Sequence, residues 1–373
     1  MRVCLIHDYL TQFGGAERVL VALMELFPEA PVYTLLYDKK LMSGRLDSSR
    51  IRTSFLQNIP LARSRHRFFP ILMPLIIEQF DLSKYDIVIS DSHSFGKGVI
   101  TGSNTLHISY CFTPMRYVWD DSHRYVREFS VPGWLRAMIP FPLTYVRLWD
   151  VFAADRVDSF IGISNFVARR IKKYYQRDAS VIYPPVDCSD YFISPNPGNR
   201  FLIVSRLMPY KRIDIAIEAF NELGLPLDIV GAGPEEANLK KIAKENIKFH
   251  GFLPDADVRN MYSQCRAFIF PQEEDFGLTV LEAAASGRPT IAFAGGGALE
   301  TVVDGETGIF FEEQTSQSLV SAVQRMLTTE FNPQKIREHA LLFSTGRFKV
   351  SFMDSIMKMW NSFERKREVT LNQ

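Results

Sequence analysis

Short runs of apolar residues alternate with amphipathic stretches along the whole chain. Successive positions in each run are apolar, so both faces of a predicted strand are expected to be buried, as in a parallel sheet. The predicted strands are 2–7, 32–36, 86–90, 106–110 and 158–163, then 200–205, 227–231, 247–251, 266–271 and 289–293. The stretches between them place apolar residues three and four positions apart, as in residues 16–27, which is typical of one helical face. The alternation predicts an α/β fold with doubly wound parallel sheets.

Two proline-rich segments divide this pattern near residue 190. Pro184 and Pro185 lie in the first segment, Pro195 and Pro197 lie in the second, and such clusters predict an extended linker. We expect residues 1–186 and 187–345 to form two Rossmann-like domains that face each other across a cleft, a common place for a ligand. Residues 346–373 are expected to form a C-terminal helix that crosses back to the N-terminal domain, with a charged tail.

Composition places the chain among soluble globular proteins. It has 373 residues, of which 46% are hydrophobic and 23% charged, so it can bury a core without a disulfide or metal. The net charge of +1 argues against a nucleic-acid-binding protein. Residues 1–186 carry 23 Lys and Arg against 17 Asp and Glu, whereas residues 187–373 carry 20 against 25. The basic half would suit an anionic partner such as phosphate or a lipid headgroup, although a solvated surface explains it too.

The chain is expected to be cytoplasmic. Its first apolar run is too short for a signal peptide, and no run reaches the roughly 20 residues that span a bilayer. The four cysteines lie far apart, without the spacing of a metal site. Residues 63–72 and 134–139 mix arginines with large apolar side chains, which suits shallow docking on an anionic membrane surface. A buried helix with outward-reaching arginines would have the same composition.

A glycine pair follows the first predicted strand. Gly14 and Gly15 lead into a helix, so backbone N–H groups at its N-terminus could bind an anion. A tight turn between strand and helix, without any ligand, would use the same residues.

Two further motifs are weaker than they first look. Gly231 and Gly233 begin a dinucleotide fingerprint, but Glu236 stands where its third glycine belongs, so a classical NAD site is not expected. Asp255 and Asp257 form a D-x-D pair that could hold a metal-bound nucleotide sugar. Because they stand at the start of an amphipathic run, capping of a helix explains them better.

The most informative segment is residues 272–289, QEEDFGLTVLEAAASGRP. Glu274 follows a predicted strand, and Glu282 lies eight residues later, about one turn into the next helix. Gly277 between them permits a tight turn close to a ligand. Both carboxylates can then reach the carboxyl edge of the sheet, where open α/β folds bind ligands. Such a pair suits the hydroxyls of a sugar and a ribose; an ordinary acidic loop would not have this apolar setting.

These residues resemble a known family. Glu274-x₇-Glu282, with Phe276-Gly277-Leu278 between, is similar to the E-x₇-E signature of the retaining family-4 GT-B glycosyltransferases. Other elements follow in the family's order: Gly14-Gly15-Ala16-Glu17, Ser205-Arg206-Leu207 with Lys211, Val230-Gly231-Ala232-Gly233-Pro234, Gly295-Gly296-Gly297-Ala298-Leu299-Glu300, and Asp304-Gly305 with Gly308. The resemblance covers most of the chain and implies the GT-B fold, with an N-terminal acceptor-side domain and a C-terminal donor domain.

Within that family, residues 109–120, SYCFTPMRYVWD, are similar to a segment of the O-antigen mannosyltransferases. Ser92-His93-Ser94 with Lys97-Gly98 fits the same subgroup. These enzymes transfer mannose from GDP-mannose to lipid-linked polysaccharide precursors. Phe112 departs from the pattern, because the family has a histidine there that is expected to hydrogen-bond the donor sugar. Lower turnover, a changed sugar preference or a substitute role for His93 are the open consequences.

The resemblance also implies roles for individual residues. Catalytic roles fall on Glu274, Arg206 and Lys211; donor-binding roles on Gly14, Gly15, Gly231, Phe252, Leu253, Phe276, Gly277, Leu278 and Glu282; and acceptor-side roles on Asp8, His93 and Arg116. Arg206 and Lys211 would neutralise the departing phosphate, Glu274 would bind the donor hexose and Glu282 the ribose. Phe252 and Leu253 would line the base pocket, although Phe252 could equally be a core residue. N–H groups of Gly296 and Gly297, at a helix start near Ala298, would add to phosphate binding.

The sequence therefore predicts a retaining hexosyltransferase without metal or cofactor. Its donor is expected to be GDP-mannose, its acceptor a polyprenyl-diphosphate-linked oligosaccharide, and its location the inner face of the cytoplasmic membrane. Two alternatives stay open: the same fold with a UDP-hexose donor, and a nucleotide-sugar-binding protein that is catalytically weak because of Phe112.

Overall fold

The computed structural model describes residues 1–59, 70–120, 122 and 138–371. It divides the chain into two compact units. Unit 1 comprises Met1–Tyr183 and Phe348–Gln373, and unit 2 comprises Pro184–Arg347.

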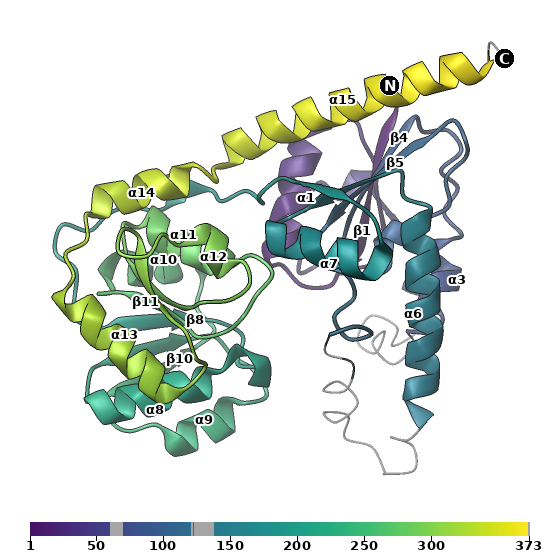
Figure 1. The fold of residues 1–373 in the computed structure, drawn as a ribbon. Helices are drawn as coiled ribbons and strands as arrows, with labels where there is room; N and C mark the ends of the chain where they lie inside the picture. The colour runs from purple at the N-terminus through teal and green to yellow at the C-terminus, as the bar shows by residue number, and fades with distance from the viewer. Residues whose placement is uncertain (60–69, 121, 123–137, 372–373) are drawn as a thin grey trace. The chain divides into compact units, whose positions relative to one another are not determined.

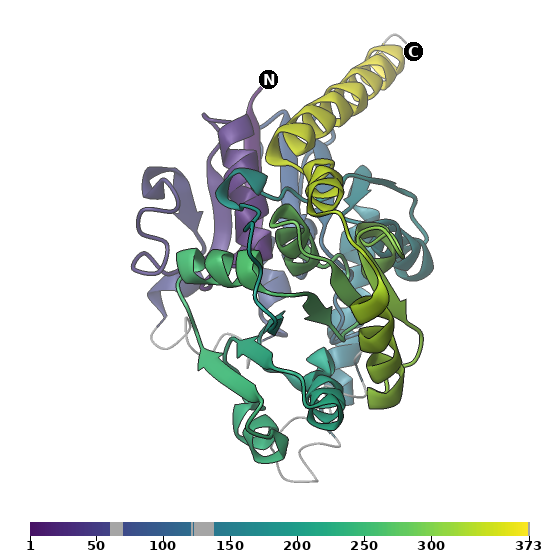
Figure 2. The ribbon, with the colours of Figure 1, turned by 90° about the vertical axis from the view of Figure 1, so that its left-hand side faces the viewer.

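Unit 1 is built on a sheet of seven parallel strands. These are β1 (Val3–Leu10), β2 (Val32–Tyr37), β3 (Ile51–Thr53), β4 (Ile87–Ser92), β5 (Leu106–Cys111), β6 (Ser159–Gly162) and β7 (Ala179–Val181). Their order is β3-β2-β1-β4-β5-β6-β7. Figure 1 labels β1, β4 and β5, and Figure 2 shows the same ribbon turned by 90°. The chain winds outward in opposite directions from β1 and β4. A topological switch point therefore lies at the carboxyl ends of these two strands, where doubly wound sheets bind ligands.

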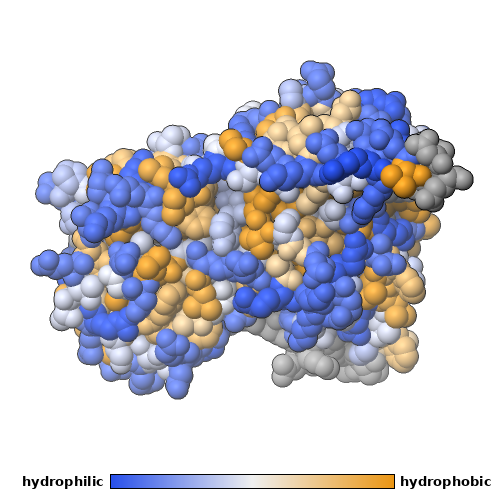
Figure 3. Space-filling view, turned by 45° about the horizontal axis from the view of Figure 1, so that its top comes forward, coloured by the Kyte–Doolittle hydropathy of each residue, from blue (hydrophilic) through white to orange (hydrophobic). Residues whose placement is uncertain are grey.

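Helices cover both faces of this sheet. They are α1 (Gly15–Leu26), α3 (Met73–Ile77), α6 (Pro140–Asp155), α7 (Asn165–Tyr175) and α15 (Thr345–Leu371), with 3-10 turns η1 (Ser48–Arg50), η2 (Phe55–Asn58) and η4 (Gly96–Gly98). Residues of α3 and α6 share one core with β1 and β4. From Phe348 onward α15 belongs to unit 1, and Figure 1 shows it passing α1. Its Lys349 Nζ lies 2.6 Å from Glu25 Oε2 of α1. Toward its exposed, charged C-terminal end this helix presents hydrophilic side chains (Figure 3).

Unit 2 is built on six parallel strands. They are β8 (Phe201–Val204), β9 (Leu227–Val230), β10 (Ile247–Gly251), β11 (Phe268–Phe270), β12 (Thr290–Phe293) and β13 (Gly308–Phe311), in the order β10-β9-β8-β11-β12-β13. Its helices are α8 (Ile213–Leu223), α9 (Glu236–Ile242), α10 (Asp255–Gln264), α11 (Leu278–Ala285), α12 (Ala298–Thr301), α13 (Ser316–Thr328) and α14 (Pro333–Leu341), with 3-10 turns η5 (Cys188–Asp190) and η6 (Pro209–Lys211).

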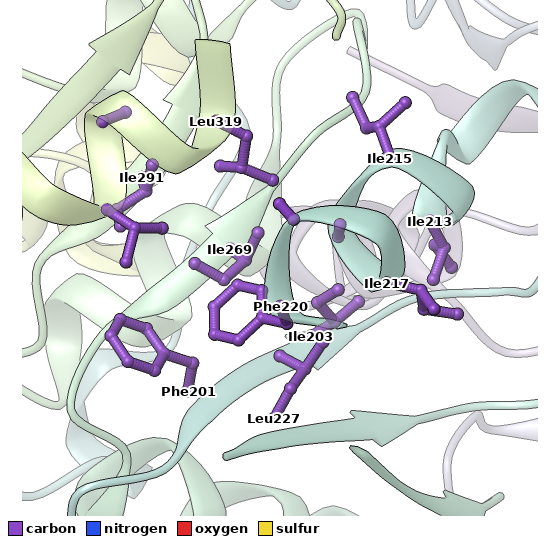
Figure 4. Packing of buried hydrophobic residues seen from close by; sticks show 14 of the residues in the cluster. Phe201, Ile203, Ile213, Ile215, Ile217, Phe220, Leu227, Ile269, Ile291 and Leu319 are labelled. Atoms are coloured by element: carbon purple, nitrogen blue, oxygen red, sulfur yellow. The ribbon is translucent and has the colours of Figure 1, made fainter. Parts of the chain in front are cut away.

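An apolar core holds one face of this second sheet against α8 and α13. Phe201 of β8 meets Phe220 of α8 edge to face, with ring centroids 5.0 Å apart (Figure 4). Both side chains are fully buried, and burial of one such side chain contributes about 1.5–3 kcal/mol. Ile203, Ile269 and Leu319 extend the same cluster. This packing fixes the sheet whose carboxyl edge carries the predicted donor residues.

The predicted α/β class with parallel sheets is confirmed, and each of the ten predicted strands overlaps an observed strand. Three strands were missed: β3, β7 and β13. Each is three or four residues long and lies at the edge of its sheet. In β3 and β7 the partly exposed positions leave little apolar pattern, whereas β13 is apolar and mostly buried but only four residues long. Gly308, named above with Asp304-Gly305 among the elements of the family resemblance, is the first residue of β13.

Candidate functional site

The carboxyl edge of the unit 2 sheet collects the predicted catalytic residues and the predicted donor-binding residues except Gly14 and Gly15, which belong to unit 1. Because the strands are parallel, the loops that follow them all leave the sheet at this edge. Arg206 and Lys211 follow β8, Gly231 follows β9, Phe252 and Leu253 follow β10, and Glu274, Phe276 and Gly277 follow β11, with Leu278 and Glu282 in α11.

Lys211 and Glu274 form an ion pair at this edge. The ammonium of Lys211, the last residue of η6, contacts Oε1 of Glu274, and 12% and 22% of the two side chains are exposed. Gln272 Nε2 lies 3.2 Å from the same oxygen. Arg206 is exposed nearby in the sequence, and its guanidinium lies 3.4 Å from the Tyr210 hydroxyl. Two cations and a carboxylate thus follow neighbouring strands of one sheet.

Two glycines let the loops after β8 and β9 touch backbone to backbone. Gly231 has φ +126°, and a Cβ there would lie 1.9 Å from the Ser205 carbonyl oxygen. A Cβ at Gly233 would lie 2.3 Å from the Leu207 carbonyl oxygen. Only glycine fits such approaches. Gly231, predicted as a donor-binding residue, therefore also fixes the loop that carries Arg206.

The glycine-rich loop after β12 locks the Glu274 loop in place. The Gly297 N–H donates to the Glu274 carbonyl at 2.8 Å, and a Cβ at Gly296 would lie 2.2 Å from that oxygen. A helix does begin at Ala298, as predicted, but it is only four residues long. The Gly297 N–H already has a backbone partner, and the predicted contact of Gly296 and Gly297 with a phosphate stays a prediction. In the structure this loop supports the backbone of Glu274.

The remaining residues of the Glu274-x₇-Glu282 segment lie at the start of α11 and within it. Gly277 caps α11 with φ +90°, a left-handed conformation that favours glycine. Glu282 is buried in α11, where one oxygen accepts a hydrogen bond from the Tyr262 hydroxyl at 3.0 Å. Phe276 is buried against Phe343, with ring centroids 5.9 Å apart.

Phe252 stands out beside this edge, since 83% of its side chain is exposed. Core packing therefore does not account for Phe252, and Leu253 next to it is half-buried.

Two residues that contact the predicted carboxylates, Tyr262 and Gln272, were not predicted from the sequence. Tyr262 looked like one apolar position of an amphipathic helix, and nothing in the local sequence connects it with Glu282 twenty residues later.

The D-x-D pair lies in the first turn of α10. A helix does begin here, but Pro254 occupies the N-cap position and no side chain caps it by a hydrogen bond, so the predicted capping role of the pair is wrong. Asp255 and Asp257 instead lie where the helix dipole favours negative charge. In the described part of the chain, no group of three or more His, Cys, Asp or Glu residues could hold a metal ion.

Two of the predicted acceptor-side residues meet at the switch point of unit 1. Asp8 near the end of β1 is fully buried and accepts hydrogen bonds from Ser92 Oγ and three backbone N–H groups of residues 93–96. His93 Nδ1 lies 3.1 Å from Asp8 Oδ2. Burial works against ionisation of Asp8, but the neighbouring His93 and the backbone donors outweigh it and lower the pKa of Asp8.

The predicted Gly14–Gly15 loop is connected to three buried polar side chains, those of Glu17, His7 and Asp91. Gly14 caps α1, and its N–H donates to Glu17 Oε2 at 2.7 Å. Glu17 Oε1 lies 3.8 Å from His7 Nε2, and His7 Nδ1 lies 3.0 Å from Asp91 Oδ2. Burial tends to lower the pKa of His7, but the two carboxylates outweigh it and raise the pKa well above its ordinary value. The Gly14 N–H is thus committed to the helix cap.

Residues 109–120 are tied to the neighbouring helices. Phe112 is buried, and its ring lies edge-on to Tyr110 with centroids 5.6 Å apart. Asp120 accepts hydrogen bonds from Arg170 and Tyr174 of α7. Arg116 is half-buried in the same segment.

The arginines predicted to meet a membrane, in 63–67 and at 136, lie outside the described residues. Among the helices that are described, none combines the length and apolarity needed to cross a membrane.

A family model of the glycosyl transferases group 1 matches residues 192–342. This range contains β8 to β13 and all the residues placed above at the carboxyl edge of unit 2. Residues 192–342 are a glycosyl transferases group 1 domain.

Similarity to individual proteins covers more residues than this group 1 domain. The O-antigen chain mannosyltransferase C of Escherichia coli is 33% identical over 229 residues, covering 56% of this chain and 60% of that protein. A GDP-mannose-dependent α-(1-6)-phosphatidylinositol monomannoside mannosyltransferase of Mycolicibacterium smegmatis is 27% identical over 227 residues, covering 52% and 58%. The chain thus spans less than two thirds of the length of either relative.

The whole chain also matches solved structures. HepE of Anabaena, in complex with UDP, superposes with a TM-score of 0.73 at 18% identity, covering 96% of this chain and all of the other. At 18% identity, this similarity supports only a shared fold. The GT-B fold predicted from the resemblance is confirmed.

Proposed function

We propose that the chain is a retaining glycosyltransferase that moves mannose from GDP-mannose to a polyprenyl-diphosphate-linked oligosaccharide, in the synthesis of O-antigen or a related polysaccharide. The observation that carries this proposal is the Lys211–Glu274 pair, with Arg206, at the carboxyl edge of a group 1 domain. Cleavage of a sugar–diphosphate bond builds negative charge on the phosphate and positive charge on the sugar. The two cations would stabilise the negative charge on the phosphate, and the carboxylate would stabilise the positive charge on the sugar.

Each residue has a distinct part in the proposed reaction. Lys211 and Arg206 bind the diphosphate, Lys as a point charge and Arg through its planar fork. Glu274 accepts hydrogen bonds from the hydroxyls of the donor hexose, and Glu282, held by Tyr262, contacts the ribose. The exposed ring of Phe252 stacks on the base. The names of the two relatives support mannose as the sugar, and one of them supports GDP as its carrier.

A lipid-linked acceptor is supported by the exposed side of α6. Phe141, Tyr145, Leu148 and Phe152 are spaced four, three and four residues apart, and all are exposed. The opposite side of the helix is buried through Leu143, Val146 and Trp149, so α6 is apolar on both sides. Such a helix favours a further apolar neighbour. We therefore propose peripheral association with the inner face of the cytoplasmic membrane.

The test is a donor panel read by thermal shift and by transfer. A ligand at 100 times its Kd stabilises a protein by about 2.7 kcal/mol, which is readily measured. We expect stabilisation by GDP and GDP-mannose but not by UDP, ADP or NAD. Mannose should appear on a short-chain polyprenyl-diphosphate oligosaccharide, and NMR of the product should show the α-configuration of the donor.

Other results would overturn specific parts of the proposal. Stabilisation by UDP alone, with transfer from a UDP-hexose, would replace the donor and keep the reaction. Stabilisation by GDP-mannose without transfer to any acceptor would favour the binding protein suggested by Phe112. An inverted product would contradict the retaining mechanism.

A further inference from the structure

A cavity of about 260 Å³ lies in unit 1, at the amino edge of its sheet. Its walls come from the turn before β5, from the segment between α6 and β6, and from α15. The lining residues are Thr101, Gly102, Ser103, Thr105, Arg156, Asp158 and Phe363. Asp8 and His93 lie at the opposite edge of the sheet, and the six residues of β5 alone extend over about 20 Å. The cavity is therefore separate from the switch point.

Arg156 supplies hydrogen-bond donors whose position is fixed. Its Nη2 donates to Glu78 Oε1 at 2.7 Å and to the Gly98 carbonyl at 2.8 Å. Its Nε is buried and has no hydrogen-bond partner among the residues that the structure describes. Because a guanidinium carries five N–H donors, Arg156 keeps donor capacity for a ligand after these two contacts are made.

The other polar groups of the lining can accept hydrogen bonds. Asp158 Oδ2 accepts the His107 N–H at 2.8 Å, which orients the carboxylate and leaves most of its lone pairs for a ligand. Thr105 Oγ1 donates to the Tyr85 carbonyl at 2.8 Å and can still accept. The hydroxyls of Thr101 and Ser103 can both donate and accept. The lining thus offers donors and acceptors together, as a ligand with several hydroxyl groups requires.

The charges around the cavity favour a neutral ligand. Arg156 pairs with Glu78, and Arg177, which donates to the carbonyls of Val157 and Asp158, adds a second positive charge beside the Asp158 carboxylate. Two cations and two carboxylates leave no net charge to attract an anion such as phosphate. An apolar ligand would bury the polar groups of Arg156 and Asp158 without partners, which is costly.

Phe363 of α15 gives the cavity one aromatic wall. Trp360 stacks on it, with ring centroids 6.0 Å apart, so the orientation of the Phe363 ring is constrained. A pyranose ring has an apolar C–H face for such a wall and hydroxyls around its edge for the polar groups. The volume lies below the range of about 300–1,000 Å³ that is typical of small-molecule pockets, so it suits one sugar unit and not a nucleotide.

We propose that this amino-edge cavity binds one neutral hexose unit of a saccharide chain, at a site separate from the catalytic residues. That the chain is the polysaccharide being extended rests on the proposed function, whereas the binding of a sugar unit does not. A second attachment point raises the effective concentration of the chain at the protein, so this site retains the chain between successive transfers.

Binding is tested in the full-length protein without any nucleotide donor. With ¹⁵N-labelled protein, we expect methyl α-mannoside to shift the backbone amide resonances of Gly102 and Ser103 with a Kd of about 1 mM, as expected for a ligand of about a dozen non-hydrogen atoms. An α-linked mannotriose should bind at least as tightly, because a unit of a chain must fit with its neighbours attached. Inorganic phosphate should leave these resonances unchanged.

Three results of this titration would overturn the proposal. The first is no shift at residues 101–105 with methyl α-mannoside at ten times the expected Kd. The second is binding of the mannoside but not of the mannotriose, which would make the cavity a site for a free sugar. The third is a shift with phosphate in place of the mannoside, which would make it an anion site.

Two variants test whether the lining residues hold the sugar. Ser103→Ala removes a hydroxyl from an exposed turn, and Phe363→Leu removes the ring but keeps an apolar side chain. Each should raise the Kd about 3–10-fold, the effect of one hydrogen bond or one aromatic contact, with an unchanged melting temperature. Ser43→Ala is the matched control, because Ser43 also lies on an exposed turn but follows β2, at the opposite edge of the sheet.

The control variant should bind the mannoside as the unmodified protein does. An unchanged Kd in either cavity variant, or an equal loss in Ser43→Ala, would overturn the proposal. None of these measurements needs transfer. A protein that binds the mannoside here but transfers no sugar would contradict the proposed function alone, and one that transfers mannose without this binding would contradict this inference alone.

Discussion

Lys211 and Glu274 neutralise each other while belonging to loops that follow different strands, β8 and β11. Each side chain is less than one quarter exposed. Removing one partner leaves the other as a partly buried charge, which is costly unless a ligand compensates it. The pair therefore serves as a ready site for a ligand that carries a phosphate for Lys211 and hydroxyls for Glu274.

We predict that Lys211→Ala and Glu274→Gln each lower kcat/KM by about 10²–10³-fold, the usual effect of losing one charge-stabilising group. The kcat/KM of the double variant should be no lower than that of the less active single variant, because both groups act on one bond cleavage. Steady-state transfer with a saturating acceptor measures this. Lys240→Ala is the control: Lys240 forms an exposed pair with Glu236 on α9, at 2.6 Å, and its loss should leave the rate unchanged. Full activity of either single variant would exclude the assigned role.

At the scale of elements, the loops of unit 2 are joined by close backbone approaches at glycines. The loop after β9 touches the loop after β8 through Gly231, and the loop after β12 touches the loop after β11 through Gly296. The positions of Arg206 and Glu274 thus depend on segments that are distant in sequence and carry no reactive group. A change in such a glycine should act on both stability and ligand binding.

We predict that Gly231→Ala destabilises the protein by more than about 3 kcal/mol, as expected when a side chain is forced against backbone. At φ +126°, its Cβ would lie 1.9 Å from the Ser205 carbonyl oxygen, so β8 and β9 must separate at their carboxyl ends. Gly224→Ala separates this collision from backbone strain. Gly224 also has positive φ, +65°, but no atom lies within 4 Å of its Cβ position, and about 1–2 kcal/mol is expected. Urea unfolding of both variants measures the difference. Equal losses would show that strain alone, and not the contact of the two loops, makes Gly231 necessary.

The interior elements could be predicted from the sequence, because a strand buried on both faces carries its apolar signal locally. Edge strands such as β3 and β7 carry no such signal, since half of their surroundings is solvent. Glu274 and Glu282 were placed on the correct loop and helix because a spacing of eight residues is a local property. The Tyr262 hydroxyl on Glu282, the use of the Gly297 N–H by Glu274 and the Asp8–His93 contact join residues that the fold alone brings together. These contacts could not be predicted from the spacing of residues along the sequence.

Across the whole molecule, charge is divided unevenly along the sequence. Residues 1–186 have an excess of six positive charges, 23 against 17, and residues 187–373 have an excess of five negative charges, 25 against 20. The exposed apolar side of α6 belongs to the basic part. An anionic lipid surface would attract this part and repel the other, and burial of apolar side chains in the interface would add to the attraction.

We predict that the protein sediments with vesicles that contain phosphatidylglycerol more than with phosphatidylcholine alone, and that the binding weakens as salt is raised. Phe141, Leu148 and Phe152 are 72%, 58% and 67% exposed, so they can enter the lipid interface without unfolding α6. Replacing all three with Ser should lower the vesicle partition coefficient at least tenfold, because each side chain contributes more than about 1 kcal/mol when buried. The same replacement at Phe192, Ile242 and Leu342, which are exposed in unit 2, should change it less than twofold. Transfer to a soluble acceptor should be unaffected by the α6 changes. Equal binding by the two triple variants would show that α6 is not the surface that meets the membrane.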